Sequence, residues 1–114
     1  MKEENAVKDK SMAFAVRIVR LYKYLSERNE FVMSKQLLRS GTSIGANVRE
    51  ALYGQSKRDF AAKMSIALKE AAETEYWLEL LHKTDYLKAE AYQSILADSK
   101  ELCKLLTTIV RNSK

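Results

Sequence analysis

No proline interrupts this chain, and apolar residues recur every three or four positions through four successive segments. Proline ends or kinks helices, whereas this spacing places apolar side chains on one face of an α-helix. The sequence therefore predicts helices over residues 5–28, 32–53, 57–83 and 89–111. Because the connections between them are short, consecutive helices should be antiparallel. We expect an all-α fold in which residues 1–114 form a single antiparallel up-down-up-down four-helix bundle.

The sharpest predicted boundary separates the second helix from the third. Gly54 predicts a C-terminal cap in the left-handed conformation. Ser56, with Asp59 three positions later, predicts a capping box that opens the third helix. Inside the second helix, Gly41 and Gly45 each disfavour helix formation by up to about 1 kcal/mol. Their spacing predicts that a neighbouring helix approaches closely there and compensates for this cost.

Two of the predicted helices carry more apolar surface than one bundle core can cover. The first helix has a second apolar group that includes Met12. On the third helix, Ile66, Trp77 and Leu80 lie away from the predicted core and alternate with acidic residues such as Glu73. Exposed apolar patches mark association surfaces. We therefore expect a homo-oligomer in which these faces pack between protomers; the alternative is that the residues are scattered and partly exposed.

A polar stripe on the second helix consists of Arg39, Ser43, Asn47 and Glu50, gathered within about 80° of arc. One interpretation is a recognition surface for phosphate, bases or a partner's backbone. The other is a polar network between subunits, in which Arg39 pairs with an acid such as Glu73 of a neighbouring copy. Arginine–carboxylate pairs are geometrically specific, which suits an assembly that closes at one angle. We favour the network.

Basic residues are concentrated toward the first helix of a chain whose formal net charge is +5. Lys10, Arg17 and Arg28 line up on one face of this helix, and Arg20 lies beside them. Such a stripe is either an ordinary solvated face or an electrostatic contact for the backbone of RNA or DNA. These four residues are the candidate nucleic-acid contacts.

The sequence offers no complete set of catalytic or metal-binding residues. Glu79 and His82 have the spacing found in di-metal helical bundles, but those sites need a second histidine. His82 is the only histidine in the chain. No other histidine remains to serve as the base of a catalytic triad. The chain also has no glycine-rich phosphate loop. We expect a non-enzymatic protein with no metal and no cofactor.

The first ten residues are charged and lack the apolar core of a signal peptide. No later apolar run approaches the roughly 20 residues that a membrane-spanning helix requires. Cys103 is the only cysteine, so the chain can form no internal disulfide. Together these features predict a cytoplasmic protein without a membrane segment.

Motifs on the second and third helices resemble those of a known family. Residues 36–40 read QLLRS, residues 43–47 read SIGAN, and residues 73–78 read ETEYWL. In order and spacing the chain resembles the small four-helix bundle proteins associated with intervening sequences in large-subunit ribosomal RNA genes. The accessory proteins of diversity-generating retroelements look like relatives. The similarity spans nearly the whole chain, although Val32 stands where many members carry proline and Glu70 where many carry serine.

The resemblance implies a bundle that assembles into a pentameric ring with a central channel and a basic surface for nucleic acid. It implies no established activity. The leading hypothesis is a non-enzymatic, ring-forming bundle that binds RNA or DNA. The alternative is a protein-interaction adaptor or scaffold, for instance for a reverse transcriptase, with no direct role in nucleic-acid binding.

Overall fold

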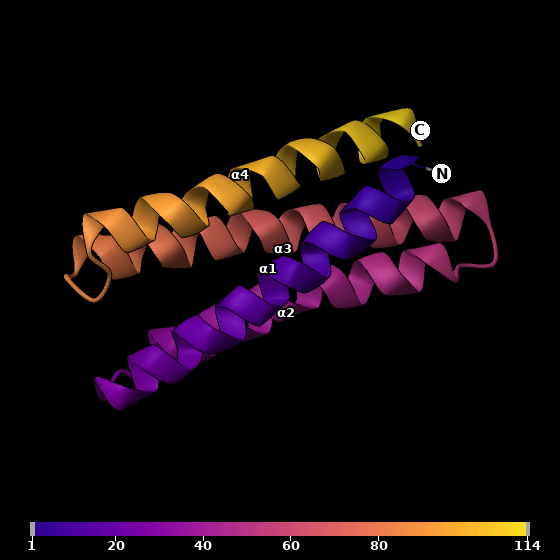
Figure 1. Ribbon diagram of the computed structural model, residues 1–114. Helices are drawn as coiled ribbons and strands as arrows, with labels where there is room; N and C mark the ends of the chain where they lie inside the picture. Colours follow the sequence, from indigo (N-terminus) through magenta and orange to yellow (C-terminus); the bar gives the residue numbers. More distant parts are fainter. Residues whose placement is uncertain (1, 114) are drawn as a thin grey trace.

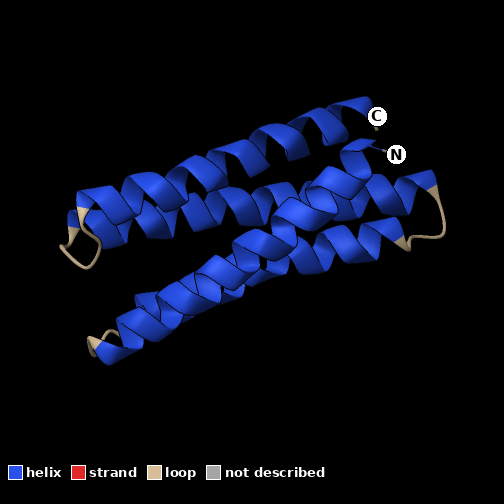
Figure 2. Ribbon diagram, viewed as in Figure 1, coloured by secondary structure: helices blue, strands red, loops and turns tan. Residues whose placement is uncertain are grey.

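The computed structural model describes residues 2–113, which contain four α-helices and no β-strand. The helices are α1 (Lys2–Glu27), α2 (Met33–Leu52), α3 (Lys57–Lys83) and α4 (Ala89–Asn112). Successive helices run in opposite directions, and both ends of the chain lie at the same end of the molecule (Figure 1). Short loops make the three connections (Figure 2). The prediction of an all-α, four-helix fold is confirmed.

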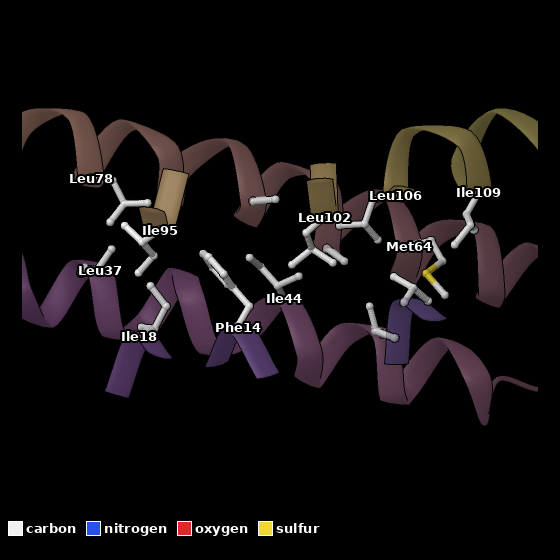
Figure 3. Packing of buried hydrophobic residues seen from close by; sticks show 14 of the residues in the cluster. Phe14, Ile18, Leu37, Ile44, Met64, Leu78, Ile95, Leu102, Leu106 and Ile109 are labelled. Atoms are coloured by element: carbon white, nitrogen blue, oxygen red, sulfur yellow. The ribbon is translucent and has the colours of Figure 1, made fainter. Parts of the chain in front are cut away.

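Buried apolar side chains from all four helices form one continuous core. Burying such a side chain stabilises a fold by about 1.5–3 kcal/mol, so this core supplies most of the favourable energy. The residues labelled in Figure 3 illustrate its length along the bundle: Phe14, Ile18, Leu37, Ile44, Met64, Leu78, Ile95, Leu102, Leu106 and Ile109. Leu21, Phe60 and Tyr92 also fit the apolar pattern but are only partly buried, at the edge of the core. The apolar faces of α1, α3 and α4 are therefore wider than the part of each helix that is fully buried.

The connection from α1 to α2 is held by a buried carboxylate. Glu30 Oε1 accepts a hydrogen bond from the backbone N–H of Ser34 at 2.7 Å, and Oε2 accepts one from Val32 at 3.3 Å. Ser34 Oγ returns a hydrogen bond to the Glu30 carbonyl at 2.8 Å. Val32, at the N-cap position, makes no side-chain cap hydrogen bond. Glu30 therefore satisfies backbone donors that the first turn of α2 leaves open.

The boundary between α2 and α3 is where predicted, but its geometry differs. No glycine within residues 2–113 has a positive φ, so the left-handed cap predicted at Gly54 is wrong. A Cβ atom on Gly54 would lie 3.1 Å from the Ala51 carbonyl and 3.3 Å from Asp59 Cβ. Glycine is thus favoured there by tight packing rather than by backbone conformation. One hydrogen bond of the predicted capping box is present, because Ser56 Oγ accepts from the Asp59 N–H at 3.1 Å.

The helix that approaches α2 at its two glycines is α1. A Cβ atom on Gly41 would lie 2.7 Å from Ile18 Cγ1, which is too close for real atoms. A Cβ atom on Gly45 would lie 3.4 Å from the backbone oxygen of Ser11, an ordinary contact. The close approach predicted from the glycine spacing is confirmed, and Gly41 is the position where it is tightest.

These distances predict opposite effects for two alanine substitutions. Gly41→Ala should lower the free energy of unfolding by about 1–2 kcal/mol, because Ile18 is fully buried and cannot move aside. Gly45→Ala should raise it by up to about 1 kcal/mol, because alanine favours the helix and fits the available space. Urea unfolding followed by circular dichroism at a fixed protein concentration measures both. Equal stability of the two variants would contradict the packing at Ile18.

Candidate functional site

A polar cluster joins α2 to α3 on their outer surface, and we call it the α2–α3 network (Arg39, Ser43, Glu70, Glu73 and Trp77). The Arg39 guanidinium donates to Glu70 Oε2 at 3.0 Å and also to Glu73. Ser43 Oγ donates to Glu70, and Trp77 Nε1 donates to Glu73 Oε2 at 2.9 Å. One arginine on α2 therefore links two carboxylates that lie one helical turn apart on α3.

The network changes the proton affinities of its members. The hydrogen bond from Arg39, and after it the one from Trp77, lowers the pKa of Glu73 below its ordinary value of 4.5. In return, the hydrogen bond to Glu73 raises the pKa of Arg39. Because Arg39 is half exposed, solvent screens the pair and limits its contribution to stability. The network is better suited to fixing the relative position of α2 and α3 than to adding much stability.

The remaining polar residues of the predicted stripe are also engaged within the chain. Asn47 Nδ2 donates to the Ser43 carbonyl at 2.8 Å, one turn earlier on α2. Glu50 pairs with Lys63 of α3 at 2.8 Å. The predicted partnership of Arg39 with Glu73 occurs within one chain rather than between copies, because antiparallel packing places both residues at the same level of the bundle. Sequence reasoning did not identify Glu70 as the second partner of Arg39, although it shares a helix face with Glu73.

The apolar residues expected at a subunit interface lie beside this network and differ in exposure. Trp77 and Leu80 are half-buried, and Trp77 packs against the core. Ile66 is 42% exposed and Tyr76 is 57% exposed. The Tyr76 ring lies edge-on to Trp77, with ring centroids 5.0 Å apart. The Trp77 indole, expected on an exposed face, is thus largely covered. Ile66 and Tyr76 form the more accessible apolar surface, and Tyr76 was not singled out from the sequence.

The basic residues predicted on the first helix mostly face α4. Lys10 pairs with Glu101 at 3.0 Å. Arg17 pairs with Asp98 at 2.7 Å and also donates to Ser94 Oγ at 3.1 Å. These contacts form a seam between two helices that also contact each other along the bundle. The charges on Lys10 and Arg17 are therefore already compensated by carboxylates of the same chain.

Arg28 is held by the connection between α3 and α4. Its guanidinium donates to the Tyr86 carbonyl at 2.6 Å, and it lies over the rings of Tyr24 and Tyr86 at 5.7 and 5.4 Å from their centroids. Asp85, next to Tyr86, has a φ of 70°, so the arginine supports a sharply turned segment. Arg20 is exposed and, within residues 2–113, makes no such contact. Of the four candidate nucleic-acid contacts, Arg20 is therefore the one with a free side chain.

The excess of basic over acidic residues is largest in the half of the bundle that holds the chain ends, which we call the basic half (residues 2–13, 45–66 and 101–113). It carries nine Lys or Arg against six Asp or Glu, whereas the remaining described residues carry ten against nine. Lys10 and Lys63 are paired. The cations of the basic half without a carboxylate partner among residues 2–113 are Lys2, Lys8, Arg49, Lys57, Arg58, Lys104 and Arg111. Sequence reasoning missed this surface because its members come from all four helices.

Groups capable of reaction chemistry have structural partners. His82 Nδ1 bonds to the Leu87 carbonyl at 2.9 Å, and the His82 ring stacks on Tyr92 with centroids 4.3 Å apart. Glu79 lies 3.8 Å from Lys83. Burial raises the pKa of the Cys103 thiol, which disfavours the reactive thiolate. Within residues 2–113 no three His, Cys, Asp or Glu side chains are grouped to hold a metal ion, and no helix there is long and apolar enough to cross a membrane.

Comparison with known proteins identifies a family and a similar solved structure. A family described as 23S rRNA-intervening sequence protein matches residues 3–108. A crystal structure of a protein of unknown function from the S23 ribosomal protein family of Bacteroides thetaiotaomicron is 64% identical in sequence. The similarity covers 96% of this chain and 98% of that one, with a TM-score of 0.94. No curated protein matches the chain.

The lowered pKa of Glu73 predicts how the α2–α3 network responds to acid. A depressed pKa contributes stability that is fully present above about pH 4.5 and is lost as the pH falls through the pKa of the folded state. Trp77 is the only tryptophan and bonds to Glu73, so its fluorescence should report this protonation. Arg39→Gln should move the midpoint of the fluorescence change to higher pH.

Lys63→Gln is the matched control for this titration, because it removes an ion pair between the same two helices without touching Glu73. Its fluorescence midpoint should equal that of the unmodified protein. If Arg39→Gln and Lys63→Gln move the midpoint alike, Arg39 does not set the pKa of Glu73.

Proposed function

This chain belongs to the family of 23S rRNA-intervening sequence proteins, and from that premise we propose that it is a non-enzymatic, homo-oligomeric bundle that binds RNA or DNA through a basic surface. The observation that carries the proposal is the basic half, where seven cations from four helices have no carboxylate partner among residues 2–113. Phosphate backbones bind such surfaces by releasing condensed counterions. The rRNA context of the family name agrees with action in the cytoplasm.

The proposed nucleic-acid surface differs from the one expected from the first helix alone. Lys10, Arg17 and Arg28 already have acceptors in α4 or in the loop before it. Using them for phosphate would require those contacts to break. Lys8 and Arg49 form no ion pair with residues 2–113. They line one shallow groove between α1 and α2. We therefore assign the main contact to the basic half, with Arg20 as a separate free cation on α1.

The first prediction of this proposal compares two variants that lose the same net charge. Lys8→Gln with Arg49→Gln should weaken binding of a labelled structured RNA by about three- to tenfold at low salt, because phosphate contacts are lost. Lys10→Gln with Arg17→Gln, whose charges are compensated by α4, should weaken it less. Fluorescence anisotropy at several salt concentrations measures both, and affinity should fall steeply with salt.

Equal weakening by the two double variants would move the contact away from the basic half. Absence of any binding of RNA or duplex DNA at micromolar protein would contradict the nucleic-acid function itself. In that case the adaptor function would become the better explanation of the family's fold.

Exposed apolar side chains support the homo-oligomeric part of the proposal. Ile66 and Tyr76 on α3 are 42% and 57% exposed. These residues lie outside the core and leave apolar surface in water. Pairing of such surfaces between copies would remove it from solvent. The resemblance to ring-forming bundles favours five copies.

The corresponding prediction concerns molar mass in solution. Light scattering should give about five times the 13.1 kDa of one chain. Ile66→Glu should shift the protein toward smaller species, because a charge placed in an apolar contact must be desolvated. Ala97→Glu, on the exposed side of α4, is the control and should leave the mass unchanged. A 13.1 kDa monomer for the unmodified chain would refute the assembly.

A further inference from the structure

The most exposed large apolar side chain among residues 2–113 belongs to Tyr53, at the end of α2. It is 82% exposed, and its hydroxyl forms no hydrogen bond with any of these residues. Its backbone N–H closes the last turn of α2 on the Arg49 carbonyl at 3.2 Å, a bond that any residue except proline could make. The fold therefore gains little from an aromatic ring at this position.

Three cations lie within five residues of Tyr53 in the sequence. Arg49 lies one helical turn before Tyr53 on the same side of α2, and Lys57 and Arg58 open α3 directly after the turn. None of the three has a carboxylate partner within the described residues. Of the two nearest acids, Glu50 is paired with Lys63, which leaves Asp59. We call Arg49, Tyr53, Lys57 and Arg58 the turn cluster.

An exposed aromatic ring among unpaired cations fits one chemical class of ligand best. A base in single-stranded nucleic acid has a free face that can stack on tyrosine, while the adjacent phosphates meet lysine and arginine. In a duplex, neighbouring bases already cover those faces, so the ring would have no role. A cation-only surface would bind both forms through phosphate alone.

The neighbouring surface leaves room for the strand to continue. A hollow of about 510 Å³ opens beside the turn, where the ends of all four helices meet. Its lining includes Gln55, Lys57, Phe60 and Asn112, and one acidic residue, Glu4. Amide groups can exchange hydrogen bonds with base edges or sugar hydroxyls, and Lys57 belongs to both the hollow and the turn cluster.

We propose that the turn cluster binds single-stranded RNA or DNA, with Tyr53 stacking on an unpaired base and Arg49, Lys57 and Arg58 holding the flanking phosphates. This rests on the nucleic-acid function proposed above and narrows it to one ligand class and one contact. Tyr53 supplies the preference for unpaired bases, and the three cations supply affinity for either form.

The test uses the full chain and two labelled probes of one sequence, an unstructured 12-nucleotide RNA and its duplex. Tyr53→Ala should weaken binding of the single strand by about tenfold, because stacking on an aromatic ring is lost. Its affinity for the duplex should stay unchanged. Tyr53→Phe keeps the ring and should bind the single strand like the unmodified protein. Arg58→Gln should weaken both probes and reduce the dependence on salt.

Phe31→Ala is the matched control, because it removes another exposed aromatic ring from a different surface, the connection between α1 and α2. It should change neither affinity. Circular dichroism and light scattering check that each variant keeps its fold and mass. A single-stranded DNA of the same sequence tests whether the sugar matters.

The outcomes separate this inference from the function on which it rests. If the unmodified protein binds both probes and Tyr53→Ala changes neither, the nucleic-acid function stands and the stacking contact is overturned. The contact is also overturned if Tyr53→Ala weakens both probes alike, or if Phe31→Ala weakens the single strand as much. If the unmodified protein binds neither probe, the proposed function fails and the turn cluster fails with it.

Discussion

The close contact between α1 and α2 at Gly41 fixes the position of α1 in the bundle. The absence of a side chain there lets Ile18 fill the space that a Cβ atom would occupy. With α1 seated at this depth, Lys10 and Arg17 reach the carboxylates of α4, and Arg28 reaches the loop that leads into it. The seam between α1 and α4 therefore depends on packing at a neighbouring face of α1. Lys10, Arg17 and Arg28, which were expected to bind nucleic acid, therefore hold α1 against α4 and the loop before it.

Charge in this molecule is thus divided between two uses. In the half away from the chain ends, Arg17 and Arg39 work as cross-links between helices, and basic and acidic residues are nearly equal in number. In the basic half, cations such as Lys8 and Arg58 have no carboxylate partner among the described residues. Exposed ion pairs stabilise a fold only weakly, so this division has more effect on where anions can bind than on stability.

Periodicity and composition predicted what depends on local sequence. The four helices, the Ser56 cap and the close approach at Gly41 all follow from spacing, capping chemistry and glycine content, and each is present. Partnerships across helices were harder to predict, because they depend on the relative level of residues far apart in the sequence. Arg39 was expected to meet Glu73 of another copy, yet antiparallel packing brings the two together within one chain. Glu30 could not be recognised as a cap, because its carboxylate reaches α2 only after the preceding turn has formed.

The basic half is also where the chain begins and ends (Figure 1). Terminal helical turns open more readily than central ones, since few contacts hold them. A polyanion bound across that end would contact the first turns of α1 and the last turns of α4 together, and its binding energy would then be linked to their closing. Binding of the polyanion would therefore slow amide hydrogen exchange in these turns, including at residues that do not touch it. A fusion partner at either terminus would be tethered to the same end of the molecule and would compete with the ligand for space.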